Sequence, residues 1–319
     1  MLDFVKRYGT LMGFALIIVF FWVNLPDTFM TARNWLNVSQ QVSMLAVVAF
    51  SMTIVMVMGD FDLSVGSMAT LSAIVAAILF SMGYSVPVGI AAGLLVGAAG
   101  GLFNGFLVSY VGILPFVTTL GTLTMFSGMA FFVSDGKTIF GRDIPKGFSD
   151  FARSGVDLEI IGISGVTIPT LSITAIFMLF VIWFLLEQTA FGRRLYAIGG
   201  NYEAARLAGI KVRSIRMIAF SLTGLGAAIG GLMLASRVAS ANPTQGAGLM
   251  LDAFATVFLG MTMSSQGEPR VLATFVGVLF LGILDNGLTQ MSVDSYVREI
   301  LVGAIIIAAV ASSSFGKQR

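Results

Sequence analysis

The residues best suited to chemistry in this 319-residue chain are acids set between apolar runs. Asp60 and Asp62 lie in the segment GDFDLSVGS (59–67), next to Ser64. Each carboxylate would cost about 2.5–3.5 kcal/mol at a membrane centre by insertion scales. Asp62 precedes an expected helix, where negative charge is favoured and Ser64 can act as N-cap. Either the acids cap a helix at the cytoplasmic surface, or they mark an unwound joint near a translocation path or gate.

A second group of polar residues carries amides and hydroxyls rather than dense charge. The segment ASANPTQGAG (239–248) could hydrogen-bond a polar solute, and further polar groups lie on glycine-bearing helices. Such groups suit a sugar better than an ion. The candidates for a translocation path or gate are Asp60, Asp62, Ser64, Asn104, Asn242, Thr244, Gln245, Asp285 and Asn286.

Missing residue types and motifs narrow the function. The chain has no cysteine and no histidine, which excludes disulfides, thiolate catalysis and the usual zinc and haem sites. It has no G-x-x-x-x-G-K-[ST] loop, and GLGAAIGG (224–231) lies inside an apolar run, where it favours helix packing. The sequence shows no acid and base placed together so that they could catalyse a plausible reaction. We expect no catalytic residue, no metal and no cofactor in this chain, so any ATP would be bound by a partner subunit.

The elements that must position these residues are membrane helices. Hydrophobic residues make up 57% of the chain and charged residues only 11%, and the mean hydropathy is +0.94. Because a soluble domain has about 25% charged residues, this composition predicts an all-α polytopic membrane protein in contact with lipid. The net charge of +2 is too small to indicate nucleic-acid binding.

Apolar runs predict about ten transmembrane helices in one transmembrane domain, 1–319. They lie near 9–25, 40–58, 64–82, 86–110, 114–133, 166–187, 214–236, 249–263, 269–290 and 294–312. The run at 249–263 is short enough to be a half-length helix. The first run could be a signal peptide, but no small-residue cleavage site follows it, which favours a retained span.

Lysine and arginine in the short loops predict the orientation. They favour both termini in the cytoplasm, a cytoplasmic loop at about 188–213 and a periplasmic loop at about 134–165. The 134–165 loop carries four basic residues against this rule, but it also carries five acids.

Two segments of the chain repeat each other. SVGSMATLSAIVAAIL (64–79) aligns with TQGAGLMLDAFATVFL (244–259) at an offset of 180, and GLFNG (101–105) resembles GILDNG (282–287). The repeat halves, about 40–133 and 214–312, are five spans apart, so they would cross the membrane in opposite directions. Inverted repeats are typical of transporters; chance similarity between small-residue segments is the alternative.

Glycines 89, 93, 97, 101 and 105 recur every four residues in the fourth span. This spacing places them on one helix face, where another backbone can approach closely. We expect this helix to lie inside the bundle.

The segment GGNYEAARLAGIKV (199–212) is charged and lies between apolar runs. Asn201 suits an N-cap, Glu203 complements the helix dipole and Gly209 suits a C-terminal stop, which predicts a helix of about two turns. A helix this short cannot span, so an ordinary connecting loop and a docking element at the cytosolic face are the alternatives. Docking to an ATPase is favoured because the chain has no nucleotide motif of its own.

TAFGRRLYAIGGNYEAARLAGIKV (189–212) resembles the cytoplasmic loop of permease subunits in ribose/xylose-type bacterial ABC sugar importers, the binding-protein-dependent inner-membrane components. GDFDLSVGS, ANPTQGAGLMLDAFATVFLG (241–260) and GILDNGL (282–288) resemble other segments of that family. GMTMSSQGEPR (260–270) departs from it, with Met261, Met263 and Glu268 where smaller residues are expected. This leaves open a specialised substrate or a heterodimeric partner.

The resemblance implies a type II ABC importer-like fold and a coupling helix at residues 200–210. Its residues would be Asn201, Glu203, Ala204, Ala205, Arg206, Leu207, Gly209 and Ile210. The implied partners are two ATP-binding cassette subunits, a second permease copy or paralogue, and a periplasmic binding protein that delivers the sugar.

Two other functions stay open. The chain could be the same kind of permease with amino acids or nucleosides as cargo. It could also be an ion-driven secondary transporter, against which we count the lack of an intramembrane ion site such as a clustered acid pair at mid-span.

Overall fold

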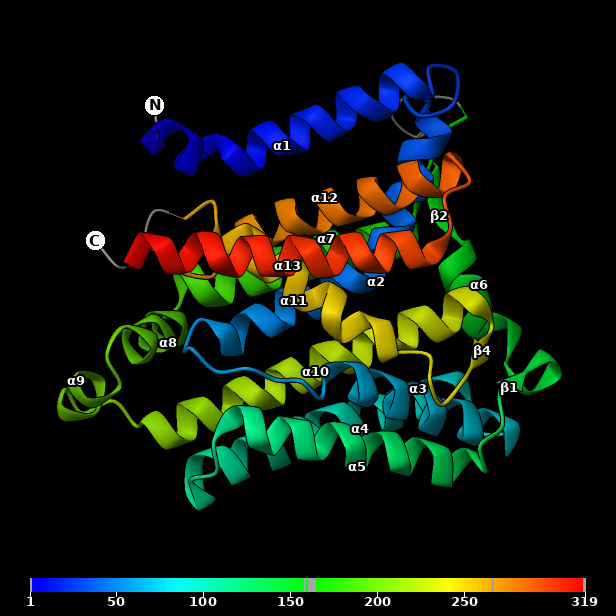
Figure 1. The fold of residues 1–319 in the computed structure, drawn as a ribbon. Coiled ribbons are helices and arrows are strands. Elements are labelled where there is room, and N and C mark those ends of the chain that lie inside the picture. The colour runs from blue at the N-terminus through cyan, green and yellow to red at the C-terminus, as the bar shows by residue number, and fades with distance from the viewer. Residues whose placement is uncertain (1, 158, 160–164, 265–266, 318–319) are drawn as a thin grey trace.

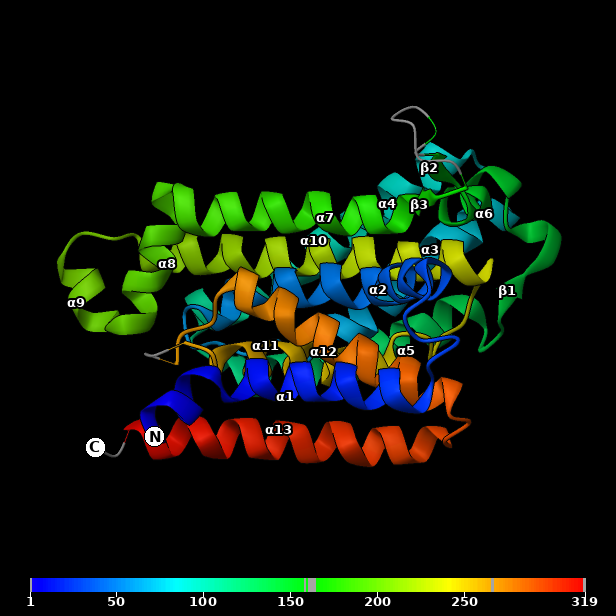
Figure 2. The ribbon, with the colours of Figure 1, turned by 90° about the horizontal axis from the view of Figure 1, so that it is seen from above.

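The computed structural model describes residues 2–157, 159, 165–264 and 267–317. Within them, ten long helices lie side by side along one direction (Figures 1 and 2). They are α1 (Leu2–Asn24), α2 (Ala32–Met56), α3 (Val65–Ser81), α4 (Val86–Phe106), α5 (Pro115–Ser134), α7 (Thr170–Trp183), α10 (Val212–Val238), α11 (Ala247–Met261), α12 (Val271–Gln290) and α13 (Ser295–Lys317). Each coincides with one of the predicted apolar runs.

Six of these helices are long and apolar enough to cross a membrane by length and composition. They are α2, α4 with its π-helical extension Leu107–Val111, α5, α7 with its π-helical extension Phe184–Gln188, α10 and α12. Residues 12–24, α3 and α11 form shorter apolar helices. The predicted all-α polytopic membrane class is therefore confirmed, and α11 is short, as the 249–263 run indicated.

The two ends of the bundle carry different short elements (Figures 1 and 2). At one end lie α8 (Ala190–Gly200) and α9 (Tyr202–Leu207), and we call it the α9 end. At the other, the strand end, lie α6 (Lys146–Arg153) and two antiparallel strand pairs, β1 (Ile139–Phe140) with β4 (Ser240–Ala241) and β2 (Gly155–Asp157) with β3 (Thr167–Pro169). The start of α1 and the end of α13 both lie at the α9 end (Figure 1).

The 134–165 loop belongs to the strand end, although residues 158 and 160–164 lie outside the described residues. Lys137 lies next to Asp135 in this loop, and its hydrogen bond and charge lower the pKa of that exposed carboxyl. The assignment of the two ends to cytoplasm and periplasm, and the bounds of the repeat halves, stay predictions.

Helix α2 runs through the centre of the bundle. Its residues from Val42 to Met56 are all buried, because the sequence is apolar around the whole helix rather than along one stripe. Helix α10 packs against α2, α3 and α4, and the segment α11–α12 completes the core. The few polar side chains inside it bond mainly to backbone carbonyls of helices, as Thr223 does to Ser51 at 2.9 Å.

The glycine face of α4 is buried as predicted, but α4 is not inside the bundle. A side chain at Gly97 or Gly101 would collide with the backbone of α10 at Gly224 or Phe220. The opposite face of α4 is open, and Leu95 is 69% exposed. The expectation of a fully enclosed helix was wrong because only one face carries small residues, while the other carries large apolar side chains.

Candidate translocation path and α9 end

Helices α3 and α11 begin next to each other near the middle of the bundle and run in opposite directions, α3 to the strand end and α11 to the α9 end (Figure 1). At this junction the backbone nitrogen of Gly246 donates to Thr70 Oγ1 at 2.9 Å. A Cβ on Gly66 would meet the carbonyl oxygen of Gly246, and a Cβ on Gly246 would meet that of Gly66. The close approach of the two helix starts therefore requires glycine at both positions.

The same turn precedes both helices. Asp62 Oδ1 accepts from the backbone nitrogen of Ser64 at 2.9 Å and from its hydroxyl at 2.6 Å. Asn242 Oδ1 accepts from the backbone nitrogen of Thr244 at 2.8 Å and from its hydroxyl at 2.7 Å. These pairs differ in position by 180 residues, as do Gly66 and Gly246, so the repeated sequence builds one local structure twice.

Ser64 does not cap α3 through its side chain. The expectation that it would was wrong because Ser64 has helical backbone angles, φ −82° and ψ −6°, rather than the extended angles of a capping residue. The Ser64 hydroxyl instead accepts from Asn104 Nδ2 of α4 at 2.8 Å. Three candidates therefore meet, each fully buried: Asp62 and Ser64 of the turn, and Asn104, which lies 40 residues after Ser64 in the sequence.

This polar cluster is set inside the protein rather than at a surface. Asp62 Oδ2 and Asn104 Oδ1 are buried and have no hydrogen-bond partner within the described residues. A surface helix cap would leave Asp62 in water, so the structure argues against that alternative for this residue. The second turn differs, because Thr244 is exposed and Asn242 Nδ2 donates to Thr138 of the 134–165 loop at 2.8 Å.

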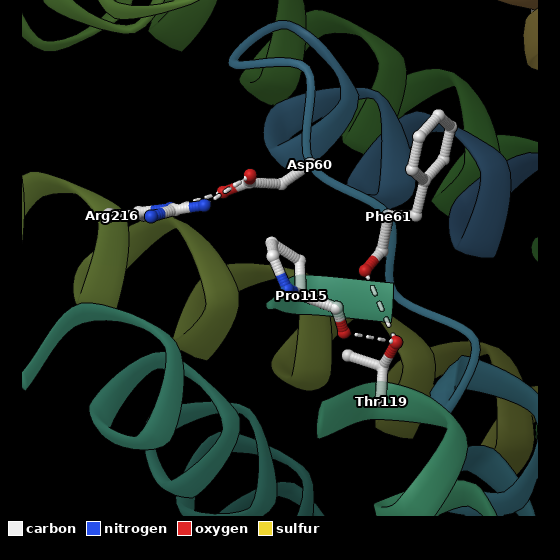
Figure 3. Close-up of polar contacts among 5 residues, drawn as sticks. All are labelled: Asp60, Phe61, Pro115, Thr119 and Arg216. Carbon is white, nitrogen blue, oxygen red and sulfur yellow. Dashed lines mark hydrogen bonds and ion pairs between the residues drawn. The ribbon is translucent and has the colours of Figure 1, made fainter. Parts of the chain in front are cut away.

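Asp60 is bonded to a residue that the sequence analysis missed. Two nitrogens of the Arg216 guanidinium, Nε and Nη2, donate to its carboxylate at 2.5 Å (Figure 3). Arg216 lies one turn into α10, close after α9. The sequence signal was available, since a single arginine inside an apolar run needs a partner.

The segment from Gly59 to Ser64 is not helical, and it is held on two sides. Gly59 has φ +80°, which ends the preceding helix. On one side Asp60 is paired with Arg216 of α10; on the other, the carbonyl oxygen of Phe61 accepts from Thr119 Oγ1 of α5 at 3.2 Å (Figure 3). The unwound joint expected from the sequence is present, and it connects α10 and α5 to the start of α3.

Asp285 and Asn286 do not join this cluster. Asn286 accepts from Gln290 on its own helix at 2.7 Å. Asp285 contacts Arg298 Nε at 2.7 Å, and Arg298 Nη2 also donates to Asp252 at 2.7 Å. The sequence analysis did not anticipate this pair of acids, because the sequence alone does not show that α13 supplies an arginine between them. No group of three or more acids able to hold a metal is found among the described residues.

At the α9 end, two short helices replace the single one expected. Helix α8 is anchored by Tyr196, whose hydroxyl lies 3.0 Å from Glu187 Oε1 and 3.3 Å from the carbonyl oxygen of Pro269. Burial, followed by the neighbouring Glu187 carboxylate, raises the pKa of Tyr196 well above its ordinary value, so this hydroxyl stays a donor. Residues 190–200, expected to be part of the cytoplasmic loop, therefore form a helix of their own.

Helix α9 projects beyond the ends of the long helices (Figures 1 and 2). Asn201 caps it by accepting from the backbone nitrogen of Ala204 at 2.9 Å, and Gly209 follows its end with φ +83°. Leu207 is 82% exposed at its tip, whereas Ala205 is buried against the protein. The exposed Glu203 and Arg206 pair at 2.8 Å. Both predicted ends of the helix are as the sequence indicated.

This fold, with half-length helices meeting inside a bundle and a short helix projecting from one end, defines a polytopic membrane permease. The chain belongs to the family described as branched-chain amino acid transport system / permease component, whose model matches residues 34–310. No solved structure matches it.

Curated relatives extend over nearly the whole chain. It is 37% identical to the ribose import permease protein RbsC of Bacillus subtilis (strain 168), covering 96% of this chain and 92% of the relative. It is 34% identical to the L-arabinose transport system permease protein AraH of Escherichia coli (strain K12), covering 95% and 89%. It is 31% identical to the D-allose transport system permease protein AlsC of the same strain, covering 97% and 91%.

Proposed function

We propose that this chain is the membrane-spanning subunit of an ATP-driven importer for a sugar. The family and the relatives, which are permeases for ribose, arabinose and allose, support a sugar as cargo. The observation that carries ATP coupling is α9, a capped six-residue helix that projects from the bundle with an exposed apolar tip at Leu207. Such a tip suits a cleft in a second protein.

The proposed assembly has two copies of this subunit, or this subunit and a paralogue, in the bacterial inner membrane. Two ATP-binding cassettes, which hold the ATP, contact the α9 helices from the cytoplasm. A periplasmic binding protein delivers the sugar at the strand end, where the 134–165 loop lies. Both termini are then cytoplasmic, because α1 begins and α13 ends at the α9 end.

The contacts at the joint suggest how movement of α9 reaches the path. Helix α10 begins five residues after α9 ends, and Arg216 in its second turn holds Asp60 of the joint. The joint leads directly into the turn of Asp62 and Ser64 and the start of α3. A displacement of α9 by a cassette would pass through α10 to the junction of α3 and α11, and would open the path to one side at a time.

Co-purification with the partner ATPase tests this function. Glu203→Arg, or a charge placed at the buried Ala205, should lower sugar-stimulated ATPase activity while the protein still inserts in the membrane. Leu207→Asp should do the same, and Arg33→Ala, at an exposed position in the first turn of α2 and outside the 134–165 loop, is the control with unchanged stimulation. Normal coupled transport in the α9 variants would contradict the docking role of this helix.

An amino acid is the second candidate cargo, because the family description names branched-chain amino acid transport. The solute retained by the partner binding protein separates the two. A retained sugar supports the first proposal, and a retained branched-chain amino acid supports the second.

A further inference from the structure

Three charged residues from three helices meet in the half of the bundle toward the strand end. Arg298, in the first turn of α13, bridges Asp252 of α11 and Asp285 of α12, with 2.7 Å between the paired atoms in each case. The cluster carries two negative charges and one positive charge. Charges inside membrane helices are costly and mark functional positions more often than packing positions.

A cavity of about 120 Å³ opens beside this cluster. Asp252, Asp285, Arg298 and Gln41 line it together with apolar side chains such as Met44 and Leu249. Polar groups converging on an otherwise apolar wall are the usual composition of a small-molecule site.

The polar groups of this cavity have unused hydrogen-bonding capacity. Arg298 contacts one oxygen of each carboxylate, and among the described residues Asp252 Oδ1 and Asp285 Oδ2 have no hydrogen-bond partner, so they remain open acceptors. In the part of the chain that the structure describes, the amide of Gln41 has no hydrogen-bond partner. The cavity therefore offers two carboxylate acceptors and an amide that can both donate and accept.

We propose that this cavity binds the hydroxylated edge of a monosaccharide on its way through the permease, with Asp252, Asp285 and Gln41 as the groups that contact it. Sugar hydroxyls supply the donors that the two carboxylates lack, and the apolar wall suits the C–H face of the ring. Arg298 is a positioning residue, because it holds both carboxylates in place. This inference rests on the proposed transport function and adds a binding site to it.

The absence of cysteine makes a clean test possible. In the full importer in membranes, Gln41→Cys is reacted with a neutral, water-soluble thiosulfonate, with and without D-ribose, D-allose or L-arabinose. A sugar at twice its Kd should slow the labelling about threefold, because protection scales as one plus the ratio of concentration to Kd. Ser85→Cys, on the exposed turn before α4, is the control and should react equally with and without sugar.

A second variant tests whether Asp285 contacts the sugar or only maintains the structure of the cavity. Asp285→Asn, added to Gln41→Cys, keeps the shape of the side chain but removes an ionised acceptor. It should abolish most of the protection while leaving unchanged the rates at which the introduced thiol and the control thiol are labelled without sugar. Protection that survives Asp285→Asn undiminished would overturn the role of this carboxylate.

The remaining outcomes distinguish this inference from the proposed function. ATP-driven sugar uptake without protection of Gln41→Cys would overturn the site and leave the transporter assignment intact. Protection of Gln41→Cys by a sugar without ATP-driven uptake would overturn the transporter assignment and leave the site intact. Protection by choline but by no sugar would overturn the proposal in favour of a site for an organic cation.

Discussion

The ion pair between Asp60 and Arg216 should be the strongest single polar contact between the joint and α10. The pair is bidentate, both bonds are 2.5 Å long, and the Asp60 side chain is only 6% exposed. Removing one partner of a buried ion pair leaves the other charge buried without a partner, which destabilises the protein by about 3–5 kcal/mol. Since the Arg216 side chain keeps some access to solvent, we expect about 3 kcal/mol for Asp60→Asn and for Arg216→Gln separately.

The double variant should cost far less than the sum of the single variants. With both charges removed, neither is left buried without a partner, so we expect a total of about 3 kcal/mol and a coupling energy of about 3 kcal/mol. Reversible unfolding in mixed detergent–lipid micelles measures all four proteins. Lys137→Ala, which breaks the exposed pair with Asp135, is the control and should change stability by less than about 1 kcal/mol.

Import measurements complete this test. If the pair transmits movement from α9 to the joint, the double variant should recover stability relative to the sum of the single changes and still show weakly coupled transport. Additive destabilisation by the two single variants would refute the buried-pair reasoning. Normal ATP-coupled transport by the double variant would refute the mechanical role of the pair.

The remaining predictions concern the junction and its turns. Gly246→Ala should abolish transport because its Cβ would collide with the carbonyl oxygen of Gly66, whereas Gly248→Ala, with open space around it, should transport normally in the same uptake assay. Ser64→Ala should destabilise the protein by about 1–3 kcal/mol, because the buried amide of Asn104 would lose its acceptor; unchanged stability in micelles would contradict that hydrogen bond. Thr244→Ala, at the exposed and equivalent position, should cost less than about 1 kcal/mol in the same measurement.

Features that depend on local sequence were predictable. The ten helices follow from hydrophobic runs, and the ends of α9 follow from Asn201 and Gly209, whose side chain and backbone preferences act within a few residues. The offset of 180 residues anticipated the shared turn before α3 and α11, because one pattern of acid or amide, hydroxyl and glycine builds one local structure.

Long-range pairing was not predictable. Nothing in the sequence near Arg216 points to Asp60, 156 residues away, and nothing near Arg298 indicates that its side chain reaches two different helices. The position of α4 was not predictable for the same reason. A glycine face indicates that one helix packs closely against α4, but it does not indicate whether another helix covers the opposite face. Asn104 and Asn286 occupy matched places in the repeats. Asn104 donates to Ser64 in the turn before α3, whereas Asn286 accepts from Gln290 on its own helix, because the surroundings of the two copies have diverged.

The central claim is that this subunit imports a sugar only as part of an ATP-driven assembly docked through α9. The most direct measurement is uptake of radiolabelled D-ribose, L-arabinose and D-allose into proteoliposomes. These contain the permease with or without its co-purified cassette subunits and binding protein, and are supplied with ATP or with an ion gradient. The account predicts uptake of one or more of these sugars only with all components and ATP, and its loss on Leu207→Asp. Uptake by the permease alone, driven by an ion gradient, would contradict it.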